Sequence, residues 1–255
     1  MAKTVHLPVV GLGNTLRKDA WWALPLTTVA VLVSFIAYAT FRGFENNYYH
    51  FTAGGADYLS PMYSPLLFEG AWAGFFTPAM LILPGPASFR LTCYYYRKAY
   101  YRSFGMDPPA CAVGEPAART NYNGERVLWV FNNLHRFTLY LAIIYILILW
   151  HDVWRSLWFG GHFGVGVGTI VMAVNVTLLS LYTFSCHALR HLVGGSVNSY
   201  STTPGGALRF KLWSAVSKLN TRHGAFAWMS LFGVALTDLY IRSVASRAIT
   251  DLRLF

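Results

Sequence analysis

Three cysteines and four histidines are the side chains of this sequence that are best suited to chemistry. The cysteines are Cys93, Cys111 and Cys186. The histidines are His135, His187, His191 and His223. Thiolates and imidazoles together bind zinc or an iron–sulfur cluster, whereas a pair of imidazoles binds haem iron. These residues are far apart in the sequence, so the elements that carry them must bring them together before they can form one site.

The composition indicates that these elements are membrane-spanning helices. The chain is 55% hydrophobic and 12% charged, whereas about a quarter of the residues in a soluble domain are charged. A bilayer-crossing helix needs about 20 mostly apolar residues, and several such stretches are present. We therefore predict an all-α, polytopic membrane protein with a single membrane domain over residues 1–255.

The hydrophobic pattern predicts a bundle of five spanning helices. They cover residues 20–44, 67–96, 126–154, 164–193 and 221–244. Pro84 and Pro86 interrupt the second helix, and the freed backbone groups there need protein or water partners. A short amphipathic segment, residues 208–220, leads into the fifth helix.

The basic residues predict the orientation of the bundle. Lys and Arg gather in the N-terminal segment and in the loops after the second and fourth helices, whereas the alternate loops carry Glu45, Asp57, Glu69 and Asp152. By the positive-inside rule, the N-terminus is cytoplasmic and the C-terminus lies outside. The net charge of +10 mostly reflects this topology, and the basic face is also suited to a soluble partner or anionic lipid. Nucleic acid is not expected as a partner, because no soluble basic domain carries the charge.

Counting inward from the outer membrane boundary places several of the candidate ligands at one depth. Cys93, His135, His187 and His223 each lie roughly 20 residues from that boundary, which is about 30 Å at 1.5 Å per residue. Cys111 is in a loop that can fold back to this level, close to the cytoplasmic interface. One histidine at this depth is equally well explained by a hydrogen bond between helices, but a whole layer indicates a functional site.

The residues alone leave the identity of a bound group open. Two stacked bis-histidine haems need four ligands at two depths, and the outer half offers only His50, His151 and His162, near the boundary or in loops. One haem between two inner histidines is possible. A mixed site with two cysteines and two histidines suits a Rieske-type 2Fe–2S cluster or zinc.

Several segments make the chain similar to a known family. They are residues 89–97, 107–116, 133–136, 186–195 and 237–240. In these segments the chain resembles the membrane-anchor subunit of succinate dehydrogenase (respiratory complex II, cytochrome b-like), in the single-anchor, five-helix form of actinobacteria called type F.

The resemblance implies a subunit of a succinate:quinone oxidoreductase in a bacterial plasma membrane. A partner flavoprotein with FAD would oxidise succinate in the tricarboxylic acid cycle, and a partner iron–sulfur subunit would pass the electrons on. This chain would dock both subunits on the cytoplasmic side and deliver electrons to quinone, for which menaquinone is expected in this group, without a catalytic residue for succinate. A higher oligomer of the complex is compatible with this interpretation.

The resemblance also implies a redox centre inside the anchor. Type F anchors contain an embedded Rieske-type 2Fe–2S cluster, for which the expected ligands are Cys93 and Cys111 with two of His135, His187 and His223. His191 and Cys186 are the reserve ligands. The two-haem anchors also have five helices, so haem b is the alternative cofactor.

A quinone pocket is expected near the cytoplasmic face. Quinone reduction needs hydrogen-bond donors at the two carbonyl oxygens, and five side chains near that face are candidates: Tyr94, Tyr95, Trp129, Arg136 and His191. Aromatic and basic residues are also enriched at membrane interfaces for anchoring alone.

Other functional classes remain open at the level of the residues. A broken helix such as the second one is common in transporters, but the sequence has no internal repeat with a matching break. Acidic residues, which usually line proton or cation pathways, are absent from the helix middles. A scaffold without a cofactor would leave the Cys and His layer unexplained, and stoichiometric iron would exclude both alternatives.

Overall fold

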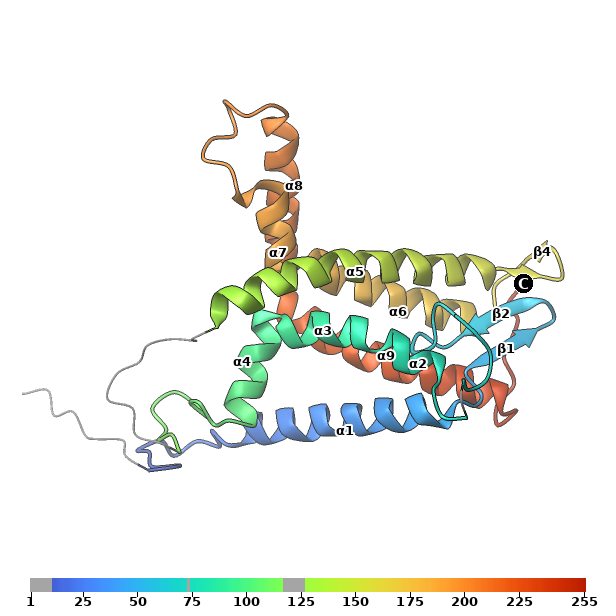
Figure 1. The fold of residues 1–255 in the computed structure, drawn as a ribbon, viewed down its shortest axis with the longest axis horizontal. Helices are drawn as coiled ribbons and strands as arrows, with labels where there is room; N and C mark the ends of the chain where they lie inside the picture. The colour runs from blue at the N-terminus through green and yellow to red at the C-terminus, as the bar shows by residue number, and fades with distance from the viewer. Residues whose placement is uncertain (1–10, 73, 117–126) are drawn as a thin grey trace, which may run out of the picture.

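The computed structural model describes residues 11–72, 74–116 and 127–255, and most of them are helical. Among these described residues, four helices are long and apolar enough to cross a membrane. They are α1 (Ala23–Glu45), α5 (Leu128–Arg155), α6 (Val167–Phe184) and α9 (His223–Ala245). Three of them run side by side in one bundle, and α1 lies along its edge (Figure 1).

The predicted second spanning helix is shorter than expected. It is divided into α2 (Pro78–Ile82), α3 (Pro84–Thr92) and α4 (Tyr94–Ser103). Proline lacks a backbone N–H and favours the first turn of a helix, so Pro78 and Pro84 each begin a new one. With five and nine residues, α2 and α3 do not reach the length that a spanning helix needs. Five complete spans are therefore not found among the described residues.

The predicted fourth helix also ends early. Instead of continuing to residue 193, α6 ends at Phe184 and is followed by α7 (His187–Arg190) and a π-helical turn, η1 (His191–Gly195). The expected amphipathic segment forms α8 (Gly206–Asn220), which points sideways out of the bundle (Figure 1).

Two short antiparallel hairpins, which the sequence analysis did not predict, lie at the opposite end of the bundle from α8. They are β1 (His50–Ala53) with β2 (Ala56–Leu59), and β3 (Trp158–Phe159) with β4 (His162–Phe163). The two turns touch at Gly55, where an added Cβ would lie 2.1 Å from the backbone nitrogen of Gly160. Only glycine fits this close approach, because the φ angle of Gly55 is also positive, at 100°.

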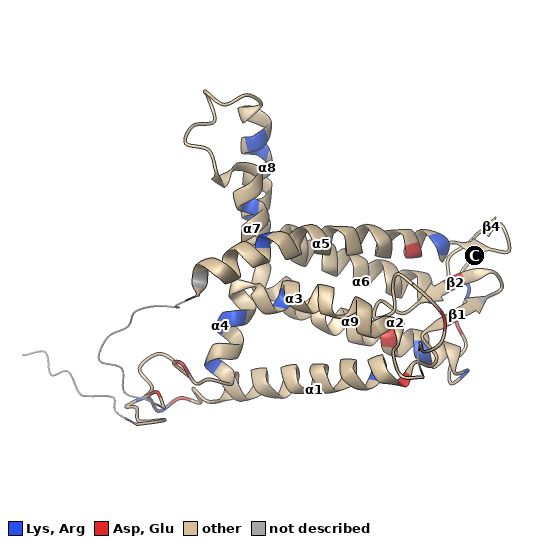
Figure 2. Ribbon diagram, in the orientation of Figure 1, with Lys and Arg blue, Asp and Glu red and all other residues tan. Residues whose placement is uncertain are grey.

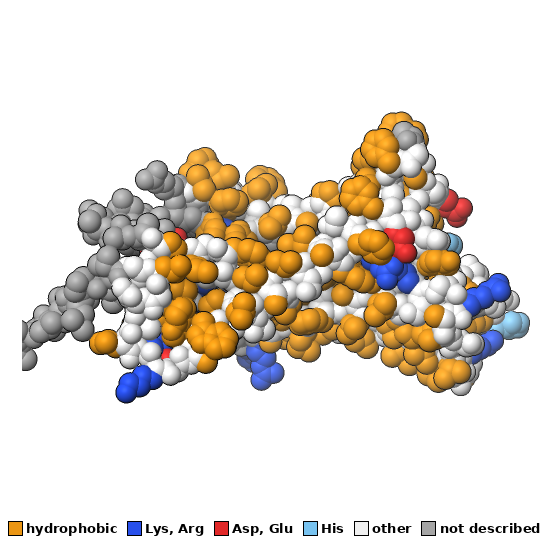
Figure 3. Space-filling view, turned by 90° about the horizontal axis from the view of Figure 1, so that it is seen from below, with side chains coloured by type: hydrophobic (Ala, Val, Ile, Leu, Met, Phe, Trp, Pro, Cys, Tyr) orange, Lys and Arg blue, Asp and Glu red, His pale blue; other side chains and the backbone are white. Residues whose placement is uncertain are grey.

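The surface of the bundle is suited to lipid. Large apolar side chains such as Ile36, Phe137, Leu147 and Leu236 are more than half exposed, which would be unfavourable in water. Figure 3 shows hydrophobic side chains spread along one long face, with charged side chains mostly toward its ends.

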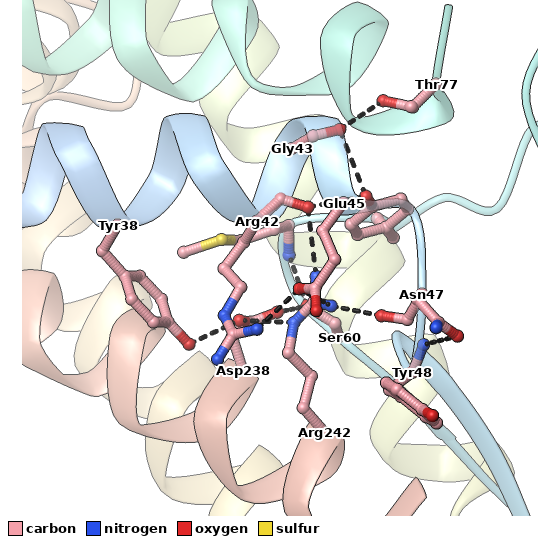
Figure 4. A network of polar contacts seen from close by, with 12 residues as sticks. Tyr38, Arg42, Gly43, Glu45, Asn47, Tyr48, Ser60, Thr77, Asp238 and Arg242 are labelled. Carbon is pink, nitrogen blue, oxygen red and sulfur yellow. Dashed lines mark hydrogen bonds and ion pairs between the residues drawn. The ribbon is translucent and has the colours of Figure 1, made fainter. Parts of the chain in front are cut away.

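A network of buried charges holds the hairpin end together (Figure 4). The carboxylate of Asp238, which is fully buried, accepts hydrogen bonds from the hydroxyls of Tyr38 and Ser60. Its third partner is the guanidinium of Arg242, with an Nε–Oδ2 distance of 2.9 Å. Arg242 also contacts the carboxylate of Glu45 at 3.1 Å. Because α1 and α9 each contribute to this network, it fixes the edge helix to the bundle.

Candidate metal centre

Four buried side chains form two thiol–imidazole pairs at the end of the bundle from which α8 projects. The sulfur of Cys93 lies 3.4 Å from Nε2 of His223, and Nε2 of His135 lies 3.0 Å from the sulfur of Cys186. All four are at most 9% exposed. We call these residues the Cys–His tetrad.

Both cysteines occupy breaks between helices. Cys93 separates α3 from α4 with an extended backbone (φ −62°, ψ 127°), and Cys186 separates α6 from α7 in the same way (φ −64°, ψ 140°). A helical residue points its side chain along the surface of its own helix. The extended residue at each break instead allows the thiol to reach a histidine on another helix.

A hydroxyl-bearing residue precedes each cysteine and contacts the histidine of the other thiol–imidazole pair. Thr92 contacts Nδ1 of His135 at 3.0 Å, and Ser185 contacts Nδ1 of His223 at 2.7 Å. His135 thus contacts the residue before Cys93 as well as Cys186 itself. The arrangement around His223 is reciprocal. A fixed partner on one ring nitrogen orients the imidazole and sets which nitrogen is available to a ligand.

An aromatic ring also covers each imidazole. Phe89 stacks on His135 with ring centroids 4.6 Å apart, and Tyr182 stacks on His223 at 5.0 Å. These rings exclude water from one side of each histidine and limit rotation about its side-chain bonds. The tetrad is therefore held in place before anything binds to it.

The ring of Tyr182 separates the cationic side chain of Arg90 from His223 of the tetrad. The guanidinium of Arg90 is centred 4.7 Å from the ring of Tyr182, a cation–π contact. Arg90 donates to the hydroxyl of Ser230 at 2.9 Å and to the backbone oxygen of Ala227 at 3.1 Å. Its positive charge favours negative charge on groups near the tetrad.

The tetrad borders a cavity of about 1050 Å³. The other lining residues include aromatic, basic and amide side chains: Tyr94, Tyr95, Asn132, Asn133, Arg136, His187, His191 and Trp228. The hydroxyl of Tyr95 accepts a hydrogen bond from the indole of Trp228 at 2.9 Å. The cavity is large enough for a small aromatic ligand and offers polar groups to orient it.

Comparisons with known proteins settle the family. The family model described as "Actinobacterial succinate dehydrogenase subunit SdhC" matches residues 23–247, which is most of the chain. The chain belongs to this SdhC family. No curated protein sequence matches it.

A solved structure agrees with this family membership. A chain of the "Mycobacterium smegmatis Sdh1 complex in the apo form" is 39% identical to the present chain, with a TM-score of 0.85. The match covers 100% of this chain and 98% of that one. The resemblance predicted from the sequence is thus confirmed: the protein is a membrane-anchor subunit of a bacterial succinate dehydrogenase, a multi-pass protein of the plasma membrane that works with the other subunits of that complex.

The structure brings together part of the ligand set expected for this SdhC protein. Cys93, His135 and His223 are in the tetrad, but its second cysteine is Cys186, which the sequence analysis held in reserve. Cys111 lies elsewhere: it is exposed, and its backbone oxygen accepts a hydrogen bond from Arg17 at 2.9 Å. His187 and His191 line the cavity without being part of either pair.

Four of the five residues expected at the quinone pocket line the cavity, and one does not. Tyr94, Tyr95, Arg136 and His191 line the cavity beside the tetrad. Trp129 lies outside this lining and is 70% exposed. Its position agrees better with anchoring at the membrane interface.

The tetrad does not form a compact site for one ion. Within residues 11–72, 74–116 and 127–255, no group of three or more His, Cys, Asp or Glu side chains surrounds a common point closely enough to bind a single metal ion. The donors are arranged instead as two pairs.

Proposed function

We propose that this SdhC subunit carries electrons through a Rieske-type 2Fe–2S cluster and delivers them to a quinone in the adjoining cavity. The proposed ligands are Cys93, His135, Cys186 and His223. The observation that carries the proposal is the reciprocal bracing of the tetrad. Each histidine contacts one cysteine through Nε2, and through Nδ1 it contacts the hydroxyl of the residue that precedes the other cysteine.

The chemistry of the donors supports a two-iron group. Two thiolates and two imidazoles are the ligands of a Rieske-type centre, in which the imidazoles raise the reduction potential. Four donors that share no common point suit a two-iron cluster better than a single tetrahedral ion, which needs four donors around one point. Burial and aromatic cover also suit a redox group, because they keep water away from it. When bound, the cluster would supply one-electron transfer.

In this proposal, different residues of the chain bind the redox group and the quinone. The tetrad holds the redox group, and Thr92 and Ser185 fix the ring nitrogens that face it. Tyr94, Tyr95, Arg136 and His191 line the cavity in which the quinone, menaquinone by our expectation, would bind. Their N–H and O–H groups can donate hydrogen bonds to the two carbonyl oxygens and orient the ring. With the predicted orientation, this cavity lies on the cytoplasmic side, where the partner subunits dock.

A matched pair of cysteine variants tests the ligand set. In the purified complex, Cys186→Ser should remove the additional 2Fe–2S signal in electron paramagnetic resonance and the iron beyond that of the soluble subunits, and it should abolish quinone reduction. Cys111→Ser should leave all three unchanged, because Cys111 is exposed and does not belong to the tetrad. Size-exclusion chromatography would show whether each complex still assembles.

Three other results would contradict the proposed ligand set or the proposed cofactor. Loss of the signal in Cys111→Ser but not in Cys186→Ser would overturn the proposed ligand set. A haem band in the reduced-minus-oxidised visible spectrum, at one or two haems per chain, would replace the cluster with haem b and leave the cysteines structural. A complex without either group would favour a scaffold.

A further inference from the structure

The direction of α8 sets it apart from the spanning helices. It points sideways out of the bundle, across the direction of the spanning helices (Figure 1), and packs against α7 and η1. If the spanning helices cross a bilayer, a helix that runs across them lies along the membrane plane. Its position at one end of the bundle places it at the level of the lipid headgroups.

One side of α8 packs against the chain. Trp213 lies under the guanidinium of Arg190, 4.7 Å from ring centroid to Cζ, and Ser217 accepts a hydrogen bond from Nε of the same arginine at 2.8 Å. Arg209 donates to the backbone oxygen of Val193 at 3.2 Å, and Val216 is buried. These contacts fix which side of the helix faces the protein.

A second side of α8 is apolar and uncovered in this chain. Leu208, Leu212, Ala215 and Leu219 follow the spacing that places residues on one helix face. Leu208 is 62% exposed and Leu212 is 46% exposed, and Ala215 is also exposed. We call these four residues the leucine flank.

The charges around the leucine flank are all positive. Lys211 and Lys218 are exposed on α8, and Arg222 follows it. The sequence contains no acidic residue between Asp152 and Asp238, and the ribbon of α8 in Figure 2 carries the colour of basic residues and not that of acidic ones. This charge is complementary to phosphate groups.

We propose that α8 is an interfacial helix that binds anionic phospholipid. The leucine flank would enter the boundary between headgroups and acyl chains, while the two lysines would reach the lipid phosphates. Apolar and basic faces on a helix in the membrane plane are typical of interfacial helices, and long lysine side chains can extend toward the headgroups. This inference does not depend on the redox centre.

Site-specific photocrosslinking in the whole complex tests the proposal. A benzophenone amino acid replaces Leu212, and the complex is placed in nanodiscs of phosphatidylcholine and phosphatidylglycerol. We expect mass-spectrometric adducts with lipid, enriched in phosphatidylglycerol over its share in the disc. The same probe at Phe41, which is exposed on spanning helix α1, should give lipid adducts without that enrichment.

Charge variants separate anionic recognition from simple contact. Replacing both lysines, Lys211→Gln with Lys218→Gln, should remove the enrichment in phosphatidylglycerol, whereas Arg247→Gln at the other end should not. Adducts with the flavoprotein, the iron–sulfur subunit or a second anchor would overturn the proposal. A lack of adducts at position 212, with lipid adducts at position 41, would overturn it as well.

Discussion

At the hairpin end of the bundle, buried charges are neutralised by opposite charges: Asp238 pairs with Arg242, and Arg242 also contacts Glu45. At the other end, the buried thiols and imidazoles of the tetrad contact one another and two hydroxyls. The charges of the first set contact one another. The second set consists of thiols and imidazoles, which are potential ligands of a redox group. The same bundle therefore uses buried polar groups for cohesion at one end and, by our proposal, for ligand binding at the other.

The largest difference between the two ends should appear in stability. Asp238→Asn keeps the size of the side chain but removes the charge that Arg242 faces. Breaking a buried ion pair typically costs about 3–5 kcal/mol, and the remaining contact of Arg242 with Glu45 favours the lower value, about 3 kcal/mol. Thermal unfolding of the purified complex in detergent should show a clear decrease in the unfolding temperature.

Two controls show whether this effect is confined to the hairpin end. Glu69→Gln, an exposed carboxylate, should not change the unfolding temperature. The iron content per folded Asp238→Asn complex should equal that of the wild type. A loss of iron in parallel with stability would mean that the two ends are coupled, and the comparison would fail.

An intermediate effect is expected from the hydroxyls that brace the tetrad. Ser185→Ala removes the partner of Nδ1 in His223 but leaves all four proposed ligands. Loss of such an orienting partner typically lowers metal affinity by about tenfold or more. We expect iron to be released correspondingly faster during incubation with a chelator, with little change in unfolding temperature.

Ser180→Ala provides the matched control on the same helix. Its hydroxyl donates to the backbone oxygen of Val176 within α6, so iron release should be unchanged. Equal release from both variants would show that Ser185 has no orienting role.

The smallest effect should come from an ion pair outside the membrane-spanning segments. The hydrogen bond that His50 donates to the carboxylate of Asp57 raises the pKa of His50, and it lowers the pKa of Asp57 in return. The contribution of His50 is complete below its unfolded pKa of about 6.5 and is lost as the pH rises through the raised folded value. The contribution of Asp57 is complete above about pH 4 and is lost as the pH falls through the lowered folded value.

The pair should therefore stabilise the protein most between about pH 4 and 6.5. Because both groups are partly exposed, the contribution should be at most about 1 kcal/mol. The unfolding temperature of the wild type should exceed that of His50→Gln in this window and converge with it at higher pH. A constant difference up to pH 9 would contradict the assignment.

The sequence predicted the class of fold and much of the tetrad for identifiable reasons. Apolar runs located α1, α5, α6 and α9, since hydrophobic length is a property of the sequence itself. Counting along helices placed Cys93, His135 and His223 at one depth, together with His187, which lies outside the tetrad. This count needs only the constant rise of a helix.

The sequence analysis was less successful where the backbone leaves the helix. The predicted helix continued to residue 193, so the sequence analysis had no reason to prefer Cys186 as a ligand. In the structure, α6 ends at Phe184, and the break turns the thiol of Cys186 toward His135. The loop around Cys111 was expected to fold back, and its path depends on contacts with Arg17 that no local pattern specifies. A usable signal was present: a hydroxyl residue precedes the cysteine in both Thr92–Cys93 and Ser185–Cys186.

The reciprocal bracing of the tetrad also constrains the order of biogenesis. His223 begins the last spanning helix, so the binding site is incomplete while the earlier helices emerge from the ribosome and enter the membrane. Each imidazole gains its final orientation only when α3, α5, α6 and α9 have met. If the tetrad binds a redox group as proposed, that group could enter only an anchor whose helices are already assembled, and a filled site would mark a completed fold.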